Sequence, residues 1–280
     1  MSIVGTVMDE RSNLPVAYAD YQRARGLSTN TVRRRSVSLG KFRAYISPCD
    51  IADATTELVE DWLESIPVAA TRRAYRSDLS AFYTWAVKRR LAVVNPVADT
   101  DSIRVHKTMP RPVAADLIGQ LIDGAPDREV ELAVALAAYA GLRRSEVANL
   151  RRDDIVLGAD PPVLFVRNGK GGRDRTIPIN PRLRPYLEHL PAGTVVRCGP
   201  GYLGAKVAEY LRSSGVDATM HALRHTFGTE GARVGDVVAL QALMGHEDLA
   251  TTSRYVALTG GRTQHVINGM YGAPTVAAAS

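Results

Sequence analysis

The stretch "REVELAVALAAYAGLRRSE", residues 128–146, joins a very apolar segment to a charged turn. Its first part has helical character and so few polar positions that we expect a buried helix. The Gly-Leu-Arg turn that follows places Arg143 at the end of this segment, where a charge needs a partner. Glu146 lies three residues further on, on the same helical face, and is suited to orient an arginine. Surface Arg–Glu pairs are common, so this motif alone decides nothing about function.

The chain has 280 residues, a length that favours two domains. Its composition, 45% hydrophobic and 23% charged, is ordinary for a soluble globular protein, and no apolar run reaches the ~20 residues of a membrane span. The N-terminus lacks a signal-peptide pattern, and Cys49 and Cys198 have no metal-like spacing. We therefore expect a reduced, cytoplasmic protein with no membrane contact. The net charge of +6 favours an anionic partner.

The hydrophobic pattern predicts a mainly α fold with a small β-sheet. Residues 1–103 contain apolar stripes at helical spacing and predict a helical domain, with Ser28 as one helix-cap candidate. Two prolines and four basic residues in 104–112 indicate a linker. Residues 113–272 combine helices with two β-rich runs and predict a mixed α+β domain, and 273–280 is typical of a disordered tail.

Arginines cluster in several separate helical segments, including "RRR" at 33–35 and "RRAYR" at 72–76. They fall largely outside the apolar stripes, so they are free to face a partner. A charge run is most often a solvated face. Several such clusters on different helices are better explained by a long polyanion than by one small ligand.

Three further motifs carry reactive side chains. "GKGGR", residues 169–173, places Lys170 at the tip of a hairpin and does not match a P-loop. "HALRHTF", residues 221–227, puts His221, Arg224 and His225 on one helical face. "LMGHEDLATTSRY", residues 243–255, contains His246 and Tyr255, which taken alone is a tyrosine with the usual packing role.

Together these motifs favour an anion site over a metal site. His221 and His225 have zinc-like spacing, but Ala222 stands where a metalloprotease needs glutamate, and no cysteine completes a site. Arginine offers a planar fork for phosphate oxygens, and histidine moves a proton near neutral pH. A cationic set without a carboxylate cluster for Mg²⁺ suits a phosphoryl centre stabilised by arginines. We therefore predict no cofactor.

The ordered series G-L-R-x-S-E, G-K-G, H-x-L-R-H and L-x-G-H followed by T-T-x-x-Y resembles the tyrosine recombinase (phage integrase) family. The resemblance implies a helical core-binding domain, a catalytic domain, and DNA cleavage through a covalent 3′-phosphotyrosine. It implies the following catalytic residues: Arg143, Lys170, His221, Arg224, His246 and Tyr255 as nucleophile. Glu146 and His225 take supporting roles.

The resemblance also implies double-stranded DNA attachment sites as partners, a protein that is monomeric when free and tetrameric on DNA, and an optional directionality factor. Residues 260–271 are a candidate for a helix passed to a neighbour. Val256-Ala257 replaces the Thr-His that typically follows the tyrosine in the Xer subgroup, which favours a phage or mobile-element integrase. The chain has little room before residue 14, so we expect no arm-binding domain. Predicted DNA contacts are Arg33, Arg34, Arg35, Arg72, Arg73, Arg76, Lys107 and Arg111.

Four alternatives remain at this point. A chromosome-dimer resolvase of the Xer type and a type IB topoisomerase share the chemistry. A helical DNA-binding regulator on the same scaffold predicts a missing catalytic residue, and none is missing. A zinc protein using His221, His225 and His246 is disfavoured by the absent glutamate and cysteines. The ending "TVAAAS" vaguely resembles a degradation tag.

Overall fold

A computed structural model describes residues 13–105, 111–167, 174–234, 236–245, 267, 269 and 270. The chain divides into two compact units, residues 1–108 and 109–280. The division falls inside the segment 104–112, while the domain boundaries at 103 and 113 and the tail at 273–280 stay predictions. No helix in the described parts of the chain is long and apolar enough to cross a membrane.

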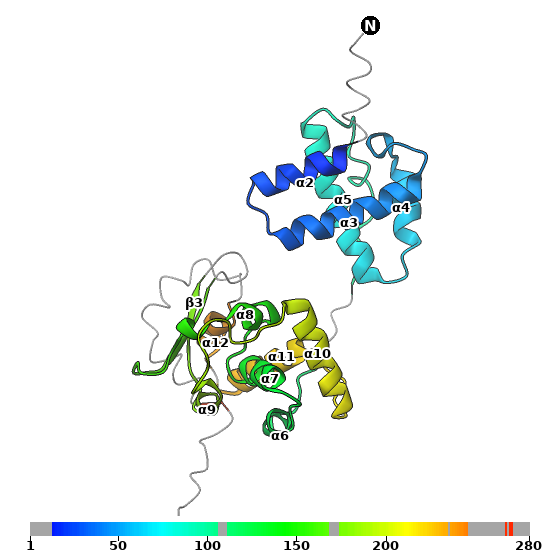
Figure 1. Cartoon of the computed structure of the whole chain (residues 1–280). Coiled ribbons are helices and arrows are strands. Elements are labelled where there is room, and N and C mark those ends of the chain that lie inside the picture. Colours follow the sequence, from blue (N-terminus) through cyan, green and yellow to red (C-terminus); the bar gives the residue numbers. More distant parts are fainter. Residues whose placement is uncertain are drawn as a thin grey trace, which may run out of the picture. The chain divides into compact units, whose positions relative to one another are not determined.

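The first unit is helical, as its sequence predicts (Figure 1). Its elements are α2 (Leu14–Ala24), α3 (Thr29–Ile46), the 3-10 helix η1 (Ile51–Asp53), α4 (Thr56–Glu64) and α5 (Ala69–Lys88). Ser28 caps α3, because its side chain accepts a hydrogen bond from the N–H of Thr31. This predicted cap is confirmed.

Aromatic side chains fill the core of the first unit. Phe42 from α3 and Phe82 from α5 are fully buried, and Phe82 packs edge-on against Tyr18 of α2 with 5.4 Å between ring centroids. Trp62 of α4 stacks on Tyr75 of α5 at 5.3 Å. The stripes expected along these helices are therefore their buried faces.

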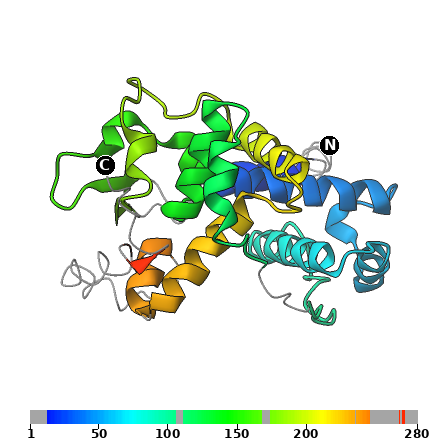
Figure 2. The same cartoon turned by 90° about the horizontal axis from the view of Figure 1, so that it is seen from below.

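The second unit surrounds one apolar helix with further helices and a small sheet. Its helices are α6 (Leu117–Asp123), α7 (Arg128–Tyr139), α8 (Arg144–Asn149), η2 (Arg152–Asp154), α9 (Arg184–Leu187), α10 (Pro200–Ser213), α11 (Met220–Val234) and α12 (Val237–Met244). Within this unit the sheet lies at one end and α10 at the other, with α7 between them (Figures 1 and 2).

The sheet is antiparallel, with strand order β1 (Ile155–Val156), β2 (Val163–Val166) and β3 (Arg175–Pro178). Leu164 pairs with Ile177, and both side chains are buried. The next pair, Phe165 and Thr176, is on the opposite, exposed face, as the two-residue period of a strand requires. β2 and β3 are the two strands of the predicted hairpin; its turn, residues 168–173, lies outside the described residues.

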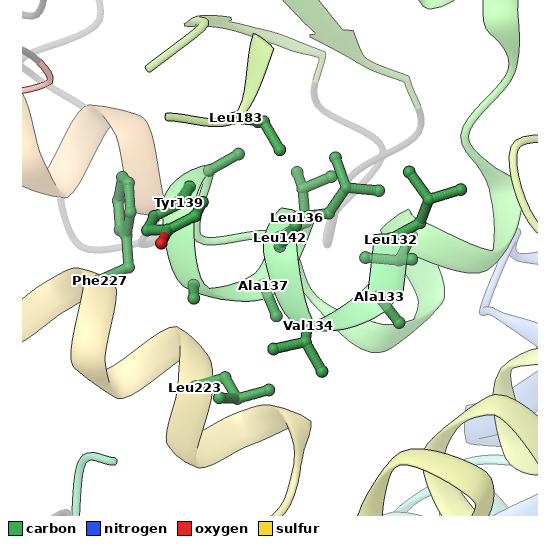
Figure 3. Packing of buried hydrophobic residues seen from close by; sticks show 14 of the residues in the cluster. Leu132, Ala133, Val134, Leu136, Ala137, Tyr139, Leu142, Leu183, Leu223 and Phe227 are labelled. Atoms are coloured by element: carbon green, nitrogen blue, oxygen red, sulfur yellow. The ribbon is translucent and has the colours of Figure 1, made fainter. Parts of the chain in front are cut away.

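α7 is buried almost all round, as its sequence predicts. Figure 3 shows Leu223 and Phe227 of α11 directed at this helix, with Phe227 beside Tyr139. α6, α8 and α10 also pack on α7. The end of α7 is therefore held rigidly, which fixes where the following turn and Arg143 begin.

Gly141 in that turn admits no larger residue. Its φ is +63°, and an added Cβ atom would lie 2.5 Å from the Phe227 ring. We expect Gly141→Ala to lower the free energy of unfolding by about 2–4 kcal/mol through backbone strain and overpacking. Chemical denaturation checks this against Gly215→Ala, where φ is +78° but nothing lies within 4 Å. Equal losses in the two variants would show that the contact with Phe227 is unimportant.

A short C-terminal piece packs on this same unit. Asn180, which is buried, donates a hydrogen bond of 3.0 Å from Nδ2 to the carbonyl oxygen of Ile267. Ile267 and Met270 are buried, and the absent side chain of Gly231 on α11 makes room for Met270. These residues belong to the segment 260–271 that was predicted to reach a neighbouring subunit. In this structure, 267, 269 and 270 lie against their own unit.

Candidate active site

The site is built outward from Glu146 in the first turn of α8. Arg143 precedes this helix, and its backbone N–H donates to Glu146 Oε2 at 2.8 Å, so the glutamate caps the helix start. Arg143 Nη1 donates to the other oxygen, Oε1, at 2.9 Å. Only 5% of the Glu146 side chain is exposed, against 23% for Arg143. The pair is therefore an internal contact and not the surface pair that the sequence also allowed.

Arg175, the first residue of β3, binds the same carboxylate from another side. Its Nη1 and Nη2 donate to Glu146 Oε1 and Oε2, both at 2.8 Å. This is the parallel, bidentate geometry that makes Arg–carboxylate pairs strong. Arg175 was not among the site residues predicted from the sequence. The signal was available, because a charged residue opens the buried strand "RTIPI" and needs a partner for the same reason as Arg143.

Arg224 of α11 completes the group. Its side chain is 3% exposed, and Nη1 lies 3.8 Å from Glu146 Oε2. Nη1 donates to the carbonyl oxygen of Gly141, and Nη2 to that of Met244. The turn after α7 thus supplies both Arg143 and a carbonyl that holds Arg224.

All three arginines donate hydrogen bonds to the C-terminal end of α12. The carbonyl oxygens of three successive residues accept from one arginine each: Leu243 from Arg175 Nε at 2.9 Å, Met244 from Arg224, and Gly245 from Arg143 Nη2 at 2.9 Å. Carbonyls at a helix end lack intrahelical partners and carry the negative end of the helix dipole, so cations are favourable there. Gly245 closes the helix in the left-handed conformation at φ +60°.

The net charge of this cluster favours binding of an anion. In the described parts of the chain, Glu146 is the carboxylate that pairs with these three arginines, which leaves an excess of two positive charges. Burial raises the pKa of Glu146, but the hydrogen bonds and charge of Arg175, and then the hydrogen bonds of Arg143, outweigh it and hold the pKa at about 2. Burial and the positive charge of Arg143 lower the pKa of Arg224 to about 9. The carboxylate is ionised at neutral pH, and a bound anion would relieve the remaining repulsion.

His221, at the start of α11, stands beside these arginines. Burial lowers its pKa, and the charges of His225, Arg224 and Arg143 lower it further. The ring of His225 meets the His221 ring edge-on, with 4.3 Å between the centroids. His221 is therefore neutral at pH 7 and able to accept a proton.

Comparison with known proteins connects this site to a family. The family model "Phage integrase, N-terminal SAM-like domain" matches residues 17–90, and the model "Phage integrase family" matches residues 203–262. The tyrosine recombinase of Thermosipho africanus is 30% identical over 85% of this chain and 93% of its own length. The chain belongs to the tyrosine recombinase family. The recombinase is also 31% identical to the tyrosine recombinase XerC of Rhodospirillum centenum, over 82% of this chain and 78% of that protein.

Solved structures confirm the fold of the recombinase. A lambda integrase dimer bound to a COC′ core site matches it with a TM-score of 0.71 and 21% identity, over 85% of this chain and 95% of that one. The integrase from mycobacterium phage Brujita matches with a TM-score of 0.54 and 25% identity, over 94% of both chains. The predicted fold class, a helical N-terminal domain with a mixed catalytic domain, is confirmed. The activity of the chain is site-specific DNA recombination.

Half of the predicted catalytic set falls in the described parts of the recombinase. Arg143, His221 and Arg224 lie together around Glu146, with His225 behind His221. Lys170, His246 and Tyr255 lie outside the described residues, as does Lys107 of the predicted DNA contacts. Within the described ranges, no three His, Cys, Asp or Glu side chains form a group that fits a metal ion.

The basic residues predicted to contact DNA divide into two groups. Arg33, Arg73 and Arg111 are exposed. Arg34 pairs with the buried carboxylate of Asp78 at 2.7 Å, yet its side chain is 55% exposed. The others are turned to the interior of the first unit: Arg35 lies 3.6 Å from the same carboxylate, and Arg76 donates to the side chain and carbonyl of Thr100 and to the carbonyl of Val97. Arg72 is partly buried. The interior partners of Arg76 give it a structural role that the sequence did not reveal, and the DNA contacts stay a prediction.

The lowered pKa of His221 can be measured. Because burial and then the positive charges of its neighbours lower the pKa of His221, we expect an NMR titration of the DNA-free recombinase to give a pKa below the usual value of about 6.5. Arg143→Met removes one of those charges and should move the titration back towards that value. A pKa of 6.5 or more in the wild type would contradict this description of the site.

Proposed function

We propose that the recombinase cleaves and rejoins DNA strands through a covalent 3′-phosphotyrosyl bond to Tyr255. The observation that carries this proposal is the arrangement of Arg143, Arg175 and Arg224 around Glu146, with neutral His221 beside them. The excess positive charge suits a phosphodiester, and its charge grows on the non-bridging oxygens during phosphoryl transfer. What the described site lacks is a nucleophile, and Tyr255 is the residue that the family motif places after Gly245 and His246.

Each residue then has a role in the transfer. The Tyr255 oxygen attacks phosphorus and the bond to the 5′-oxygen breaks, while His221 accepts the phenol proton and Lys170 donates a proton to the leaving oxygen. Arg143 and Arg224 bind the non-bridging oxygens, where loss of one donor costs roughly 10²–10³ in rate. His246 binds the same phosphate. Religation reverses these transfers, and the energy of the broken bond is kept in the phosphotyrosine, so the cycle needs no ATP.

The first experiment uses duplexes selected from a random library by binding to the recombinase. In each selected duplex, a nick is placed beside successive positions of the segment that the bound recombinase covers. Cleavage next to a nick releases a short strand that diffuses away, so religation is prevented and the adduct accumulates. We expect a protein–DNA adduct that survives denaturant at one position on each strand. If none of the nicked duplexes gives such an adduct, the proposed chemistry is wrong.

We further propose that its role is integration or excision of a phage or mobile element. The similarity to the phage Brujita integrase over 94% of both chains supports this role, as does Val256-Ala257 after the tyrosine. Chromosome-dimer resolution is the second candidate, because several similar relatives are named XerA, XerC or XerD. Both roles require DNA sites and an assembly on DNA; one solved integrase with this fold is a tetramer bound to a Holliday junction.

A cellular assay separates the two roles. The recombinase is expressed in bacteria that lack their own Xer proteins, together with plasmids carrying its selected sites. Integration predicts joining of two different sites on separate molecules, in a direction that an added directionality factor reverses. Resolution of plasmid dimers through two copies of one site, without joining of different sites, would instead support the Xer role.

A further inference from the structure

Arg175 connects three parts of the catalytic unit through one guanidinium. Nη1 and Nη2 hold the Glu146 carboxylate of α8, and Nε binds the carbonyl oxygen of Leu243 at the end of α12. The residue itself begins β3, five residues after Lys170 in the sequence. Its side chain is 11% exposed. A guanidinium enclosed and bonded in this way is oriented towards the protein.

The hydrogen bonds at Glu146 show how Arg175 affects Arg143 and Arg224. A carboxylate accepts about four hydrogen bonds. At Glu146, Oε1 accepts from Arg143 Nη1 and Arg175 Nη1, and Oε2 accepts from the Arg143 N–H and Arg175 Nη2. The carboxylate is thereby saturated, and Arg224 Nη1 stays 3.8 Å away, beyond hydrogen-bond length.

We infer that Arg175 is a positioning residue for DNA cleavage, which keeps Arg143 and Arg224 available for the scissile phosphate by occupying half of the Glu146 carboxylate. This rests on the proposed role of those two arginines. Without Arg175, two acceptor positions of Glu146 open, and Arg224, whose Nη1 lies 3.8 Å from Oε2, can move to fill them. The N–H groups of Arg224 then point towards Glu146, and less positive charge is available to stabilise the scissile phosphate.

The bond to Leu243 gives Arg175 a second effect. Arg175, Arg224 and Arg143 bind the carbonyls of residues 243, 244 and 245 in turn. An added Cβ at Gly245 would lie 3.3 Å from Arg175 Nη1, so the guanidinium packs on the end of the helix. Arg175 thus holds the end of α12, after which His246 and Tyr255 follow in the sequence.

The test compares cleavage of two substrates by Arg175→Met and Arg175→Lys. One is a nicked duplex with a normal scissile phosphate; the other carries a methylphosphonate there, which has no negative charge on its non-bridging atoms. On the phosphate we expect each variant to cleave about 10²-fold more slowly than wild type. On the methylphosphonate we expect each variant to cleave less than about tenfold more slowly than wild type. The uncharged substrate needs less positive charge to stabilise its transition state.

The matched control is Arg167→Met. Arg167 lies on the same hairpin and pairs with another carboxylate, Asp154, at 2.5 Å, but is 63% exposed. We expect the Arg167→Met variant to cleave both substrates at the wild-type rate. Thermal unfolding of every variant is measured alongside; if Arg175→Met does not fold, Arg175→Lys, which keeps the charge, decides the question.

Two results would overturn the inference. In the first, Arg175→Lys and any folded Arg175→Met cleave the phosphate as fast as wild type. In the second, their losses are equal on both substrates, which is what general damage to the fold produces. A wild-type protein that forms no adduct would instead refute the proposed function, so the two failures are distinguishable.

Discussion

Tyr255→Phe is expected to abolish the covalent adduct with nicked DNA completely. The substitution removes the only oxygen of the side chain and therefore the proposed nucleophile, while the arginines that bind the phosphate remain. Affinity for intact DNA should change less than about threefold, because most of it comes from contacts between basic residues and the backbone phosphates. Denaturing gels measure the adduct, and gel-shift titrations measure the affinity.

Tyr202→Phe is the matched control for this loss. Tyr202 lies in the first turn of α10 in the same unit, and it is 67% exposed. This variant should form the adduct at the wild-type rate. An adduct formed by Tyr255→Phe as readily as by wild type would refute the assignment of the nucleophile.

Glu146→Ala is expected to lower the free energy of unfolding by about 3–5 kcal/mol, because it leaves buried charges without their partner. Arg143, Arg175 and Arg224 would then face one another with no carboxylate between them. Chemical denaturation measures the loss. The control is Glu131→Ala, which breaks an Arg–Glu pair of the same three-residue spacing at the surface; its expected cost is below about 1 kcal/mol. Similar costs for the two variants would mean that Glu146 is not the centre of the cluster.

The same residue predicts a pH dependence of stability. The pKa of Glu146 is about 2 in the folded protein, below its ordinary value of 4.5. A lowered pKa means that the folded state favours the ionised carboxylate, so its contribution is present above pH 4.5 and is lost as the pH falls from 4.5 towards 2. Glu146→Gln removes this part of the acid destabilisation. Its stability should therefore fall less steeply with acid than that of wild type, and parallel curves would contradict the pKa shift.

The sequence predicted the parts of the fold that local patterns encode. Phe42 and Phe82 lie on apolar stripes of helical period, and both are buried. Ser28 caps its helix through a side chain that is typical of caps. Leu164 and Ile177 are buried, and the residue that follows Leu164 and the one that precedes Ile177 are exposed on the other face of the hairpin. Such signals arise within a few residues of the chain, so they can be identified without knowledge of the tertiary structure.

The organisation of the site was harder to predict, because its contacts are distant in sequence. Glu146 and Arg175 are 29 residues apart, and Arg143 and Gly245 are 102 apart. Glycine at position 245 predicts a helix end, but a backbone carbonyl has no sequence signature of its own. For the same reason the intramolecular partners of Arg76, Thr100 and the Val97 carbonyl, were not predicted. Residue types suggested which side chains matter, and the tertiary structure shows how they are held.

The arginine cluster, held by Glu146 and the end of α12, is proposed to bind the scissile phosphate for attack by Tyr255. A crystal structure of the wild-type recombinase trapped on its nicked DNA tests it most directly. We predict an ester bond from Tyr255 to the 3′-phosphate, with nitrogens of Arg143 and Arg224 about 2.7–2.9 Å from the non-bridging oxygens and Arg175 still on Glu146. A phosphate bonded to another residue, or lying beyond hydrogen-bond length of both Arg143 and Arg224, would contradict the claim.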